Sequence, residues 1–140
     1  MTHPAGARHR FVEHTGELEL RLEAPTLAAL LEEGARALAE VMAEDASGPP
    51  TEPPERVEVA ASDRESLLVS WLNELVYRGE VSKCVYRDVH VERADDRRVE
   101  ATLRGRTPAS PRTAVKAATW HRLRVRETST GLEATVVLDV

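Results

Sequence analysis

The sequence predicts an α+β fold, a single domain in which two amphipathic helices pack on a mostly antiparallel sheet of about six strands. Strand and helix patterns occur in the order β, α, β, α, and four more strand patterns then follow without a helix between them. Consecutive strands favour hairpins, whereas a parallel sheet needs a long crossover between its strands. The domain is expected to cover residues 11–140, and residues 1–10 are expected to form a flexible tail.

The first strand is predicted from Phe11 to Ala24, because apolar and charged residues alternate with a period of two in its second half. The core face of this half holds Leu18, Leu20 and Leu22. The stretch HTGE at 14–17 fits the pattern poorly. The same alternation puts His14 on the core side, as a partly buried and hydrogen-bonded histidine, and Glu17 on the other face among solvated carboxylates.

Both helices are predicted from apolar residues that recur at spacings of three and four. The first extends from a cap at Thr26 to about residue 44. The second extends from about residue 63 to residue 78, behind a capping box formed by Ser62 and Glu65. The proline-rich segment at 45–55 is predicted to be a surface loop, because proline disrupts helices and inner strands.

The remaining strands are short alternating patterns separated by turn residues. A strand at 57–59 precedes the second helix, and a hairpin is predicted on the two sides of a turn at 94–97. A loop at 105–113 leads to a long strand at about 115–127, and a second tight turn leads to a final strand that ends at Val140.

The composition excludes several classes of protein. A net charge of -5 over 140 residues argues against a domain that binds nucleic acid through its overall charge. The single cysteine, Cys84, excludes a disulfide within the chain and is expected to be a small core residue. No apolar run approaches the roughly 20 residues of a membrane span, and the first ten residues lack the apolar segment of a signal peptide. The expected location is therefore the cytoplasm, without membrane contact.

Motifs of the common enzyme classes are also missing. The sequence contains no phosphate-binding loop, no His-Glu-x-x-His, no Cys-x-x-Cys and no Gly-x-Ser-x-Gly. A stand-alone hydrolase or nucleotidyl transferase is therefore the least favoured hypothesis.

Carboxylates near the two ends of the chain form one candidate site. Asp139 stands one residue before the terminal carboxylate of Val140, and two negative groups so close together repel unless water or a cation screens them. If Glu17 came alongside, three hard oxygen donors would converge, a set that suits Mg²⁺, Ca²⁺ or Mn²⁺ better than Zn²⁺. The alternative is that Asp139 is only a charge at the end of a strand.

A basic stripe forms a second candidate site. On a regular strand, one face would hold Lys116, Trp120, Arg122, Arg124 and Arg126. Such a stripe could face a phosphate, a nucleotide or an acidic partner. The alternative is the solvated face of an edge strand, where positive charge discourages aggregation.

Four motifs, in this order, resemble the archease family over residues 11–140. They are HTGELE at 14–19, SLLVSWLNELVY at 66–77, VKAATWH at 115–121 and the terminal Leu-Asp-Val. The first motif departs from the family pattern of His-Thr-Ala-Asp, a hydrophobic residue and glycine. Glu17 stands where the family usually has aspartate, and Glu19 where it usually has glycine, so the side chain is longer and a further negative group is added.

The resemblance implies an accessory protein and not a stand-alone enzyme. Archeases assist RtcB-type RNA ligases in tRNA splicing and RNA repair, by promoting GTP-dependent guanylylation of the ligase and its repeated turnover. Residue by residue, the resemblance implies a Ca²⁺, Mg²⁺ or Mn²⁺ site at Glu17 and Asp139, with the terminal carboxylate of Val140, and an activating role for Lys116. GTP would be used by the ligase, and RNA would be met only through the ligase.

A second role is also proposed for proteins of this kind. It is that of a general chaperone or specificity modulator of RNA-modifying enzymes, such as tRNA methyltransferases. This role would depend on exposed apolar surface and would have little need of Lys116.

Overall fold

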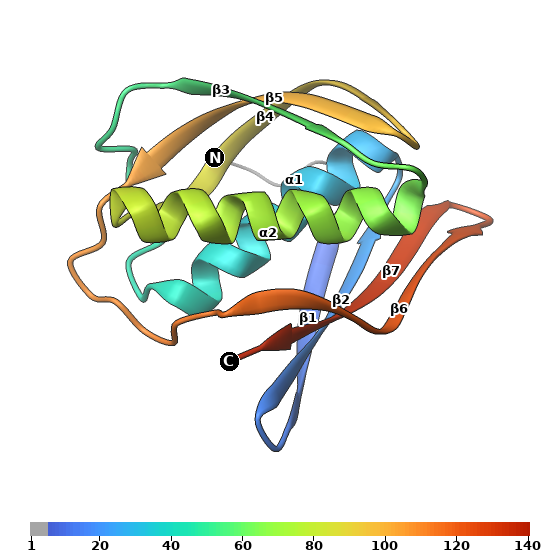
Figure 1. Ribbon diagram of the computed structural model, residues 1–140, viewed down its shortest axis with the longest axis horizontal. Helices are drawn as coiled ribbons and strands as arrows, with labels where there is room; N and C mark the ends of the chain where they lie inside the picture. The colour runs from blue at the N-terminus through green and yellow to red at the C-terminus, as the bar shows by residue number, and fades with distance from the viewer. Residues whose placement is uncertain (1–5) are drawn as a thin grey trace.

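The structure is a computed structural model that describes residues 6–140 (Figure 1). Two helices and seven strands follow one another as β1 (Arg8–His14), β2 (Glu17–Ala24), α1 (Leu27–Met42), β3 (Glu55–Ala60), α2 (Arg64–Ser82), β4 (Val85–Asp95), β5 (Arg98–Arg106), β6 (Ala117–Thr128) and β7 (Gly131–Asp139). The α+β fold class is therefore confirmed.

The strands form two sheets, one with the order β1-β2-β7-β6 and one with the order β3-β5-β4. Neighbouring strands within each sheet are antiparallel. In Figure 1, α2 crosses the molecule between the three-stranded sheet above it and the four-stranded sheet below it. The division into two sheets was not part of the prediction, because alternation reveals the buried face of a strand but not its partner.

The core lies where the helices meet the two sheets, and its largest fully buried side chain is Trp71 of α2. The Trp71 indole Nε1–H donates a 2.9 Å hydrogen bond to the backbone carbonyl of Leu31 in α1, so the buried ring is also satisfied as a donor. Truncating a buried tryptophan typically costs about 3–5 kcal/mol. The buried Trp71 side chain as a whole therefore contributes substantially to fixing the two helices against each other.

The predicted first strand is in fact a hairpin. β1 and β2 pair with His14 opposite Glu17, and Thr15 and Gly16 form the loop between them. Gly16 adopts a φ of 74°, a conformation that glycine reaches without steric cost. The prediction of a core-facing His14 is wrong, because the turn leaves this side chain exposed.

The domain also begins earlier than predicted. β1 starts at Arg8, so residues 8–10 belong to the sheet and not to a flexible tail. The physical reason is that these residues pair with β2, where Arg8 lies opposite Glu23. Residues 1–5 of the expected tail lie outside the described residues.

The boundaries of the helices follow their caps. Thr26 caps α1 as predicted, and its hydroxyl accepts a 3.1 Å hydrogen bond from the Ala29 amide. The cap of α2 is Asp63 and not Ser62, because the Asp63 carboxylate accepts a 2.8 Å bond from the Ser66 amide.

The second helix also continues past the predicted end at residue 78. It runs through Gly79 to Ser82, and Lys83 ends it in the left-handed conformation with a φ of 58°. A Cβ atom on Gly79 would lie 2.7 Å from the backbone oxygen of Cys84. Gly79 therefore permits a close approach of the chain and does not stop the helix.

An ionic cluster joins β1 to α1 beneath the four-stranded sheet. His9 is hydrogen-bonded through its two ring nitrogens to Glu33 and, at 2.7 Å, to Glu40. Glu33 also accepts a 2.7 Å bond from Arg36, and both of these side chains are buried. The bonds from Glu33 and Glu40 raise the pKa of His9 to about 9, so the imidazole is protonated at neutral pH.

Within residues 6–140, neither helix is both long enough and apolar enough to cross a membrane.

Candidate functional site

The antiparallel pairing of β2 with β7 brings the two ends of the chain together. Glu17 lies directly opposite Asp139 in this ladder. Residues directly opposite in an antiparallel pair have Cβ atoms about 4.5–5.5 Å apart. The carboxylates that the sequence singled out at the two ends are therefore neighbours on one face of the sheet.

Lys116 and Val140 lie at the same end of the sheet. The Lys116 amide donates a 2.8 Å hydrogen bond to the backbone oxygen of Asp139, and the Lys116 side chain is exposed. Val140 follows Asp139 directly and is half-buried. The backbones of these four residues therefore lie at the same end of the sheet, whereas the face opposite Asp139 on β6 is occupied by Ala117 and not by Lys116.

Asn73 of α2 fixes the start of β6 and was missed by the sequence analysis. Its side-chain amide donates a 3.0 Å hydrogen bond to the Ala118 carbonyl and accepts a 2.7 Å bond from the Ala118 amide. These two bonds imitate a neighbouring strand along the outer edge of β6. They hold the backbone two residues after Lys116, and nothing in the sequence distinguishes Asn73 from the neighbouring polar residues of the helix, Ser70 and Glu74.

The predicted basic stripe is broken by an irregularity in β6. Thr119 pairs with Val137 and Arg124 pairs with Thr135, so the four residues 120–123 face a single residue of β7. Arg122 lies within this bulge with a φ of 55°. The odd number of extra residues reverses the alternation, so Lys116 and Trp120 do not continue the face of Arg124, and the prediction of one continuous stripe is wrong.

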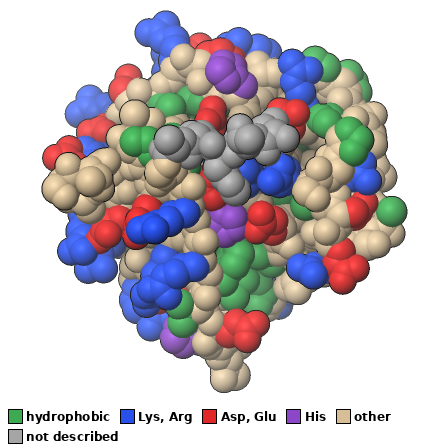
Figure 2. Space-filling model, turned by 180° about the vertical axis from the view of Figure 1, so that it is seen from behind, with side chains coloured by type: hydrophobic (Ala, Val, Ile, Leu, Met, Phe, Trp, Pro, Cys, Tyr) green, Lys and Arg blue, Asp and Glu red, His purple; other side chains and the backbone are tan. Residues whose placement is uncertain are grey.

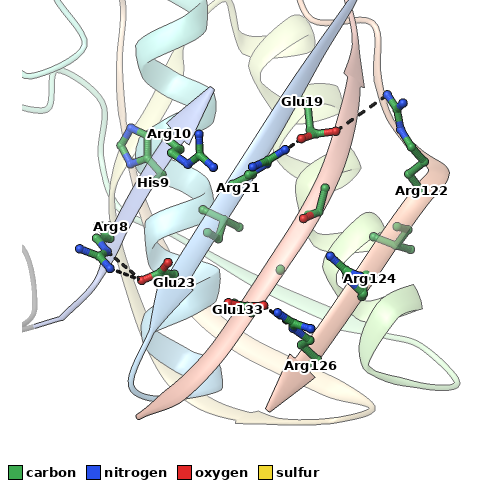
Figure 3. Close-up of a pocket in the computed structure, with 14 residues that line it drawn as sticks. Arg8, His9, Arg10, Glu19, Arg21, Glu23, Arg122, Arg124, Arg126 and Glu133 are labelled. Carbon is green, nitrogen blue, oxygen red and sulfur yellow. Dashed lines mark hydrogen bonds and ion pairs between the residues drawn. The ribbon is translucent and has the colours of Figure 1, made fainter. Parts of the chain in front are cut away.

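The bulge directs Arg122 toward the carboxylates of β2. Its Nη2 atom lies 3.2 Å from a carboxylate oxygen of Glu17. The same atom lies 3.9 Å from a carboxylate oxygen of Glu19 (Figure 3). Arg21 approaches Glu19 from the other side, with 2.7 Å between Nε and the carboxylate oxygen. Arg122 could not be assigned this role from spacing, because its position depends on the bulge.

Glu19 therefore does not act as an uncompensated negative charge beside Glu17. Its side chain is buried, although it stands on the outer face of the sheet. The hydrogen bond from Arg21 holds the pKa of the Glu19 carboxyl below its usual value, against the opposing effect of burial. The crowding of Glu17 that the sequence suggested is relieved by two guanidinium groups.

The oxygen atoms at this end of the sheet are ligands that suit a hard divalent cation. Glu17, Asp139 and the terminal carboxylate of Val140 supply only oxygen atoms, which Ca²⁺, Mg²⁺ and Mn²⁺ prefer. Among residues 6–140 no cluster of three or more His, Cys, Asp or Glu side chains is positioned to hold a metal. A cation here would thus have two side-chain carboxylates and would compete with Arg122 for Glu17.

Comparison with known proteins identifies close structural and sequence relatives. Residues 9–140 match the model of the Archease protein family. The chain is 34% identical over 137 residues to "Protein archease" of Archaeoglobus fulgidus, covering 95% of this chain and 99% of that protein.

Two solved structures have the same fold. The solution structure of protein 1598 of Methanobacterium thermoautotrophicum superposes with a TM-score of 0.76 at 27% identity, covering 94% of this chain and 98% of the other. The crystal structure of an archease from Thermotoga maritima, described as a possible chaperone, gives a TM-score of 0.63 at 20% identity, covering 92% and 94% of the two chains.

Proposed function

This chain belongs to the archease family, and we propose that it acts as an accessory protein that activates an RtcB-type RNA ligase. In this proposal it promotes guanylylation of the ligase by GTP and allows repeated turnover in RNA repair and tRNA splicing. The chain has no turnover of its own, and the ligase uses the GTP and holds the RNA.

The observation that carries the proposal is that the Lys116 backbone is bonded to that of Asp139, which lies opposite Glu17, at one exposed end of the four-stranded sheet. An ammonium group on a flexible stem can approach a triphosphate as a point charge. A site with both signs of charge at its rim suits an activator that enters a partner's active site, where fixed charges stabilise a charged transition state.

The residues of this chain divide the work. Lys116 neutralises phosphate charge, and its backbone hydrogen bond to Asp139 fixes the chain before β6 beside the end of β7. Glu17 and Asp139 would hold a divalent cation with the terminal carboxylate, and such a cation supplies charge neutralisation at a phosphate when bound. Arg122 compensates the charge of Glu17 when no cation is present.

The test is ligation by the RtcB-type ligase of the same cell, with GTP and Mg²⁺ or Mn²⁺, under single-turnover and multiple-turnover conditions. The intact chain should raise the number of turnovers, and Lys116→Ala and Asp139→Asn should each lose this effect while remaining folded. Arg104→Ala is the control, since Arg104 is exposed on the other sheet and makes no ion pair with residues 6–140. No stimulation with any divalent metal would refute the proposal, and full activity of both site variants would refute the site.

A chaperone or specificity modulator of RNA-modifying enzymes, such as tRNA methyltransferases, is the second candidate. It is supported by exposed apolar side chains, because Tyr77, Val81 and Trp120 are 63%, 64% and 61% exposed, and the first two stand one turn apart on α2. Protection of a client enzyme against aggregation that is lost in Tyr77→Ser and Val81→Ser but kept in Lys116→Ala would favour this role over ligase activation.

A further inference from the structure

The outward face of the four-stranded sheet carries a row of arginines that crosses all four strands. Arg10 of β1 lies opposite Arg21 of β2, Arg21 lies opposite Thr135 of β7, and Thr135 lies opposite Arg124 of β6. The row thus consists of three guanidinium groups and one hydroxyl, without an acidic residue.

The neighbouring row on the same face has a different charge pattern. There Arg8 lies opposite Glu23, Glu23 opposite Glu133, and Glu133 opposite Arg126. Each arginine in this row is paired with its glutamate, with a distance of 2.7 Å between Arg8 and Glu23 (Figure 3). In this row the positive and negative charges cancel, because each arginine has a glutamate partner within the sheet.

In the arginine row, the positive charges are not matched by acidic partners to the same extent. Arg21 is held by Glu19, but Arg10 and Arg124 make no ion pair or hydrogen bond through their side chains with any residue of 6–140. Arg10 and Arg21 lie directly opposite each other, and like charges in this position destabilise the pairing of two strands. An arrangement that costs stability and is not compensated within the fold is typical of a binding site for an anion.

The two rows line a hollow of about 790 Å³ that is open to solvent (Figure 3). Six arginines line it, namely the three of the row together with Arg8, Arg122 and Arg126, against three glutamates, Glu19, Glu23 and Glu133. Figure 2, which shows the molecule from behind, has Lys and Arg side chains gathered at the lower left, although the whole chain carries a net charge of -5. The positive charge is therefore local and concave.

From these features we propose that the arginine row Arg10–Arg21–Arg124 binds the phosphate backbone of a single nucleic-acid strand directly. All the cations that line the hollow are arginine or histidine and none is lysine, and the planar guanidinium fork matches two phosphate oxygens. The row spans three strand spacings, about 14 Å, so its two ends contact separate phosphates of a strand and not the phosphate tail of a single nucleotide.

The lining also predicts what kind of recognition this is. No Phe, Tyr or Trp side chain lines the hollow, so bases are not offered a stacking platform. Phosphate contacts fix the position of a strand without reading its sequence. Binding should therefore be independent of sequence and strongly dependent on salt, and it goes beyond ligase activation because it needs no ligase.

The test is fluorescence anisotropy of the full chain with a labelled single-stranded oligoribonucleotide, at several salt concentrations. The logarithm of the binding constant should fall with the logarithm of the salt concentration by about 0.7 per phosphate contact, or about 2 for three contacts. Arg10→Gln and Arg124→Gln should each weaken binding several-fold and lower this slope by about 0.7. Both variants should fold, because neither side chain makes an ion pair with the described residues.

Arg104→Gln serves as the matched control, because Arg104 is an exposed strand arginine of β5 in the other sheet. Unchanged binding by this variant supports the assignment, and a loss equal to that of Arg10→Gln overturns it. The proposal is also overturned if no binding is detected at the lowest salt concentration. Two competitors distinguish the ligand. Displacement of the labelled strand by tripolyphosphate as effectively as by unlabelled strand would indicate a site for small anions, and equally effective displacement by poly-glutamate would indicate a site for an acidic protein. Either result overturns the nucleic-acid proposal. These outcomes are independent of the ligase assay.

Discussion

Glu17 and Asp139 face each other across the β2–β7 ladder, although they stand near opposite ends of the chain. Two carboxylates in this position repel each other, and the fold accommodates them through Arg122, which lies 3.2 Å from Glu17. The end of the sheet therefore has a built-in competition between an arginine and any cation for the same carboxylate.

This competition predicts the response of thermal stability to divalent cations. A cation that binds only the folded chain raises the midpoint of unfolding in proportion to the logarithm of its excess over the dissociation constant. We expect Ca²⁺ or Mn²⁺ to raise the midpoint, Asp139→Asn to abolish the rise, and Arg122→Ala to enlarge it because Glu17 is released. Differential scanning fluorimetry with and without the cation measures all three, and an undiminished rise in Asp139→Asn would refute the site.

Removal of the Asn73 side-chain amide should loosen the start of β6. Asn73→Ala leaves the Ala118 amide and carbonyl without their partner, which costs roughly 1–3 kcal/mol when such groups are partly buried. Urea denaturation measures this loss, and amide exchange should accelerate at Ala118 more than at Val136 in the centre of the sheet. Asn73→Asp should not restore the stability, since a carboxylate would face the Ala118 carbonyl oxygen. Wild-type stability of Asn73→Ala would show that β6 is held by other contacts.

Stability should decrease at alkaline pH because of His9. Its pKa is raised from 6.5 to about 9 by the hydrogen bonds to Glu33 and Glu40, so the folded state binds the proton more tightly than the unfolded chain. The stabilisation is complete below pH 6.5 and is lost as the pH rises through about 9, with a magnitude on the order of 1–3 kcal/mol. Urea denaturation across this range should show the decline in wild type and a flatter profile in His9→Gln; parallel profiles would contradict the assignment.

Glu40 should make the stability of the fold decrease at acidic pH, whereas His9 makes it decrease at alkaline pH. Its pKa is lowered chiefly by the hydrogen bond with His9, so its contribution is present above the pKa of the unfolded chain and is lost as the pH falls through the lowered value. Glu40→Gln should therefore lessen the acid-induced loss of stability, which the same titration measures at its acidic end.

Gly79→Ala should destabilise the chain although alanine is the better helix former. The added Cβ would lie 2.7 Å from the backbone oxygen of Cys84, and a backbone atom moves only at the expense of the turn that follows α2. We expect a loss of about 1–3 kcal/mol in the free energy of unfolding. Glu80→Ala, at the next and exposed position, is the control and should change stability little.

Part of this architecture could be read from the sequence. Both helices, the proline-rich loop and the C-terminal hairpins follow from apolar periodicity and turn residues, which are local properties. The adjacency of Glu17 and Asp139 was proposed only as a condition, because strand neighbours are set by tertiary packing.

The sequence does contain a signal for the hairpin at HTGE, namely a change in the phase of the alternation between apolar and polar residues. Phe11 and Leu20 lie opposite each other on the core face, yet they occupy odd and even positions in the sequence. A continuous strand cannot bury both, whereas a two-residue turn with Gly16 reverses the alternation between them. The bulge in β6 had no such signal, since Arg122 adopts a φ of 55° that arginine seldom takes and that surrounding contacts must enforce.

The double hydrogen bond from Asn73 has a consequence for encounters between molecules. β6 is an outer strand of its sheet, and outer strands expose backbone groups on which another polypeptide can assemble as an added strand. At Ala118 both of these groups are already occupied by a side chain of the same molecule. A single amide thus makes this stretch of the sheet border a poor template for intermolecular β-sheet growth, while the arginines of β1 discourage it by charge at the other border.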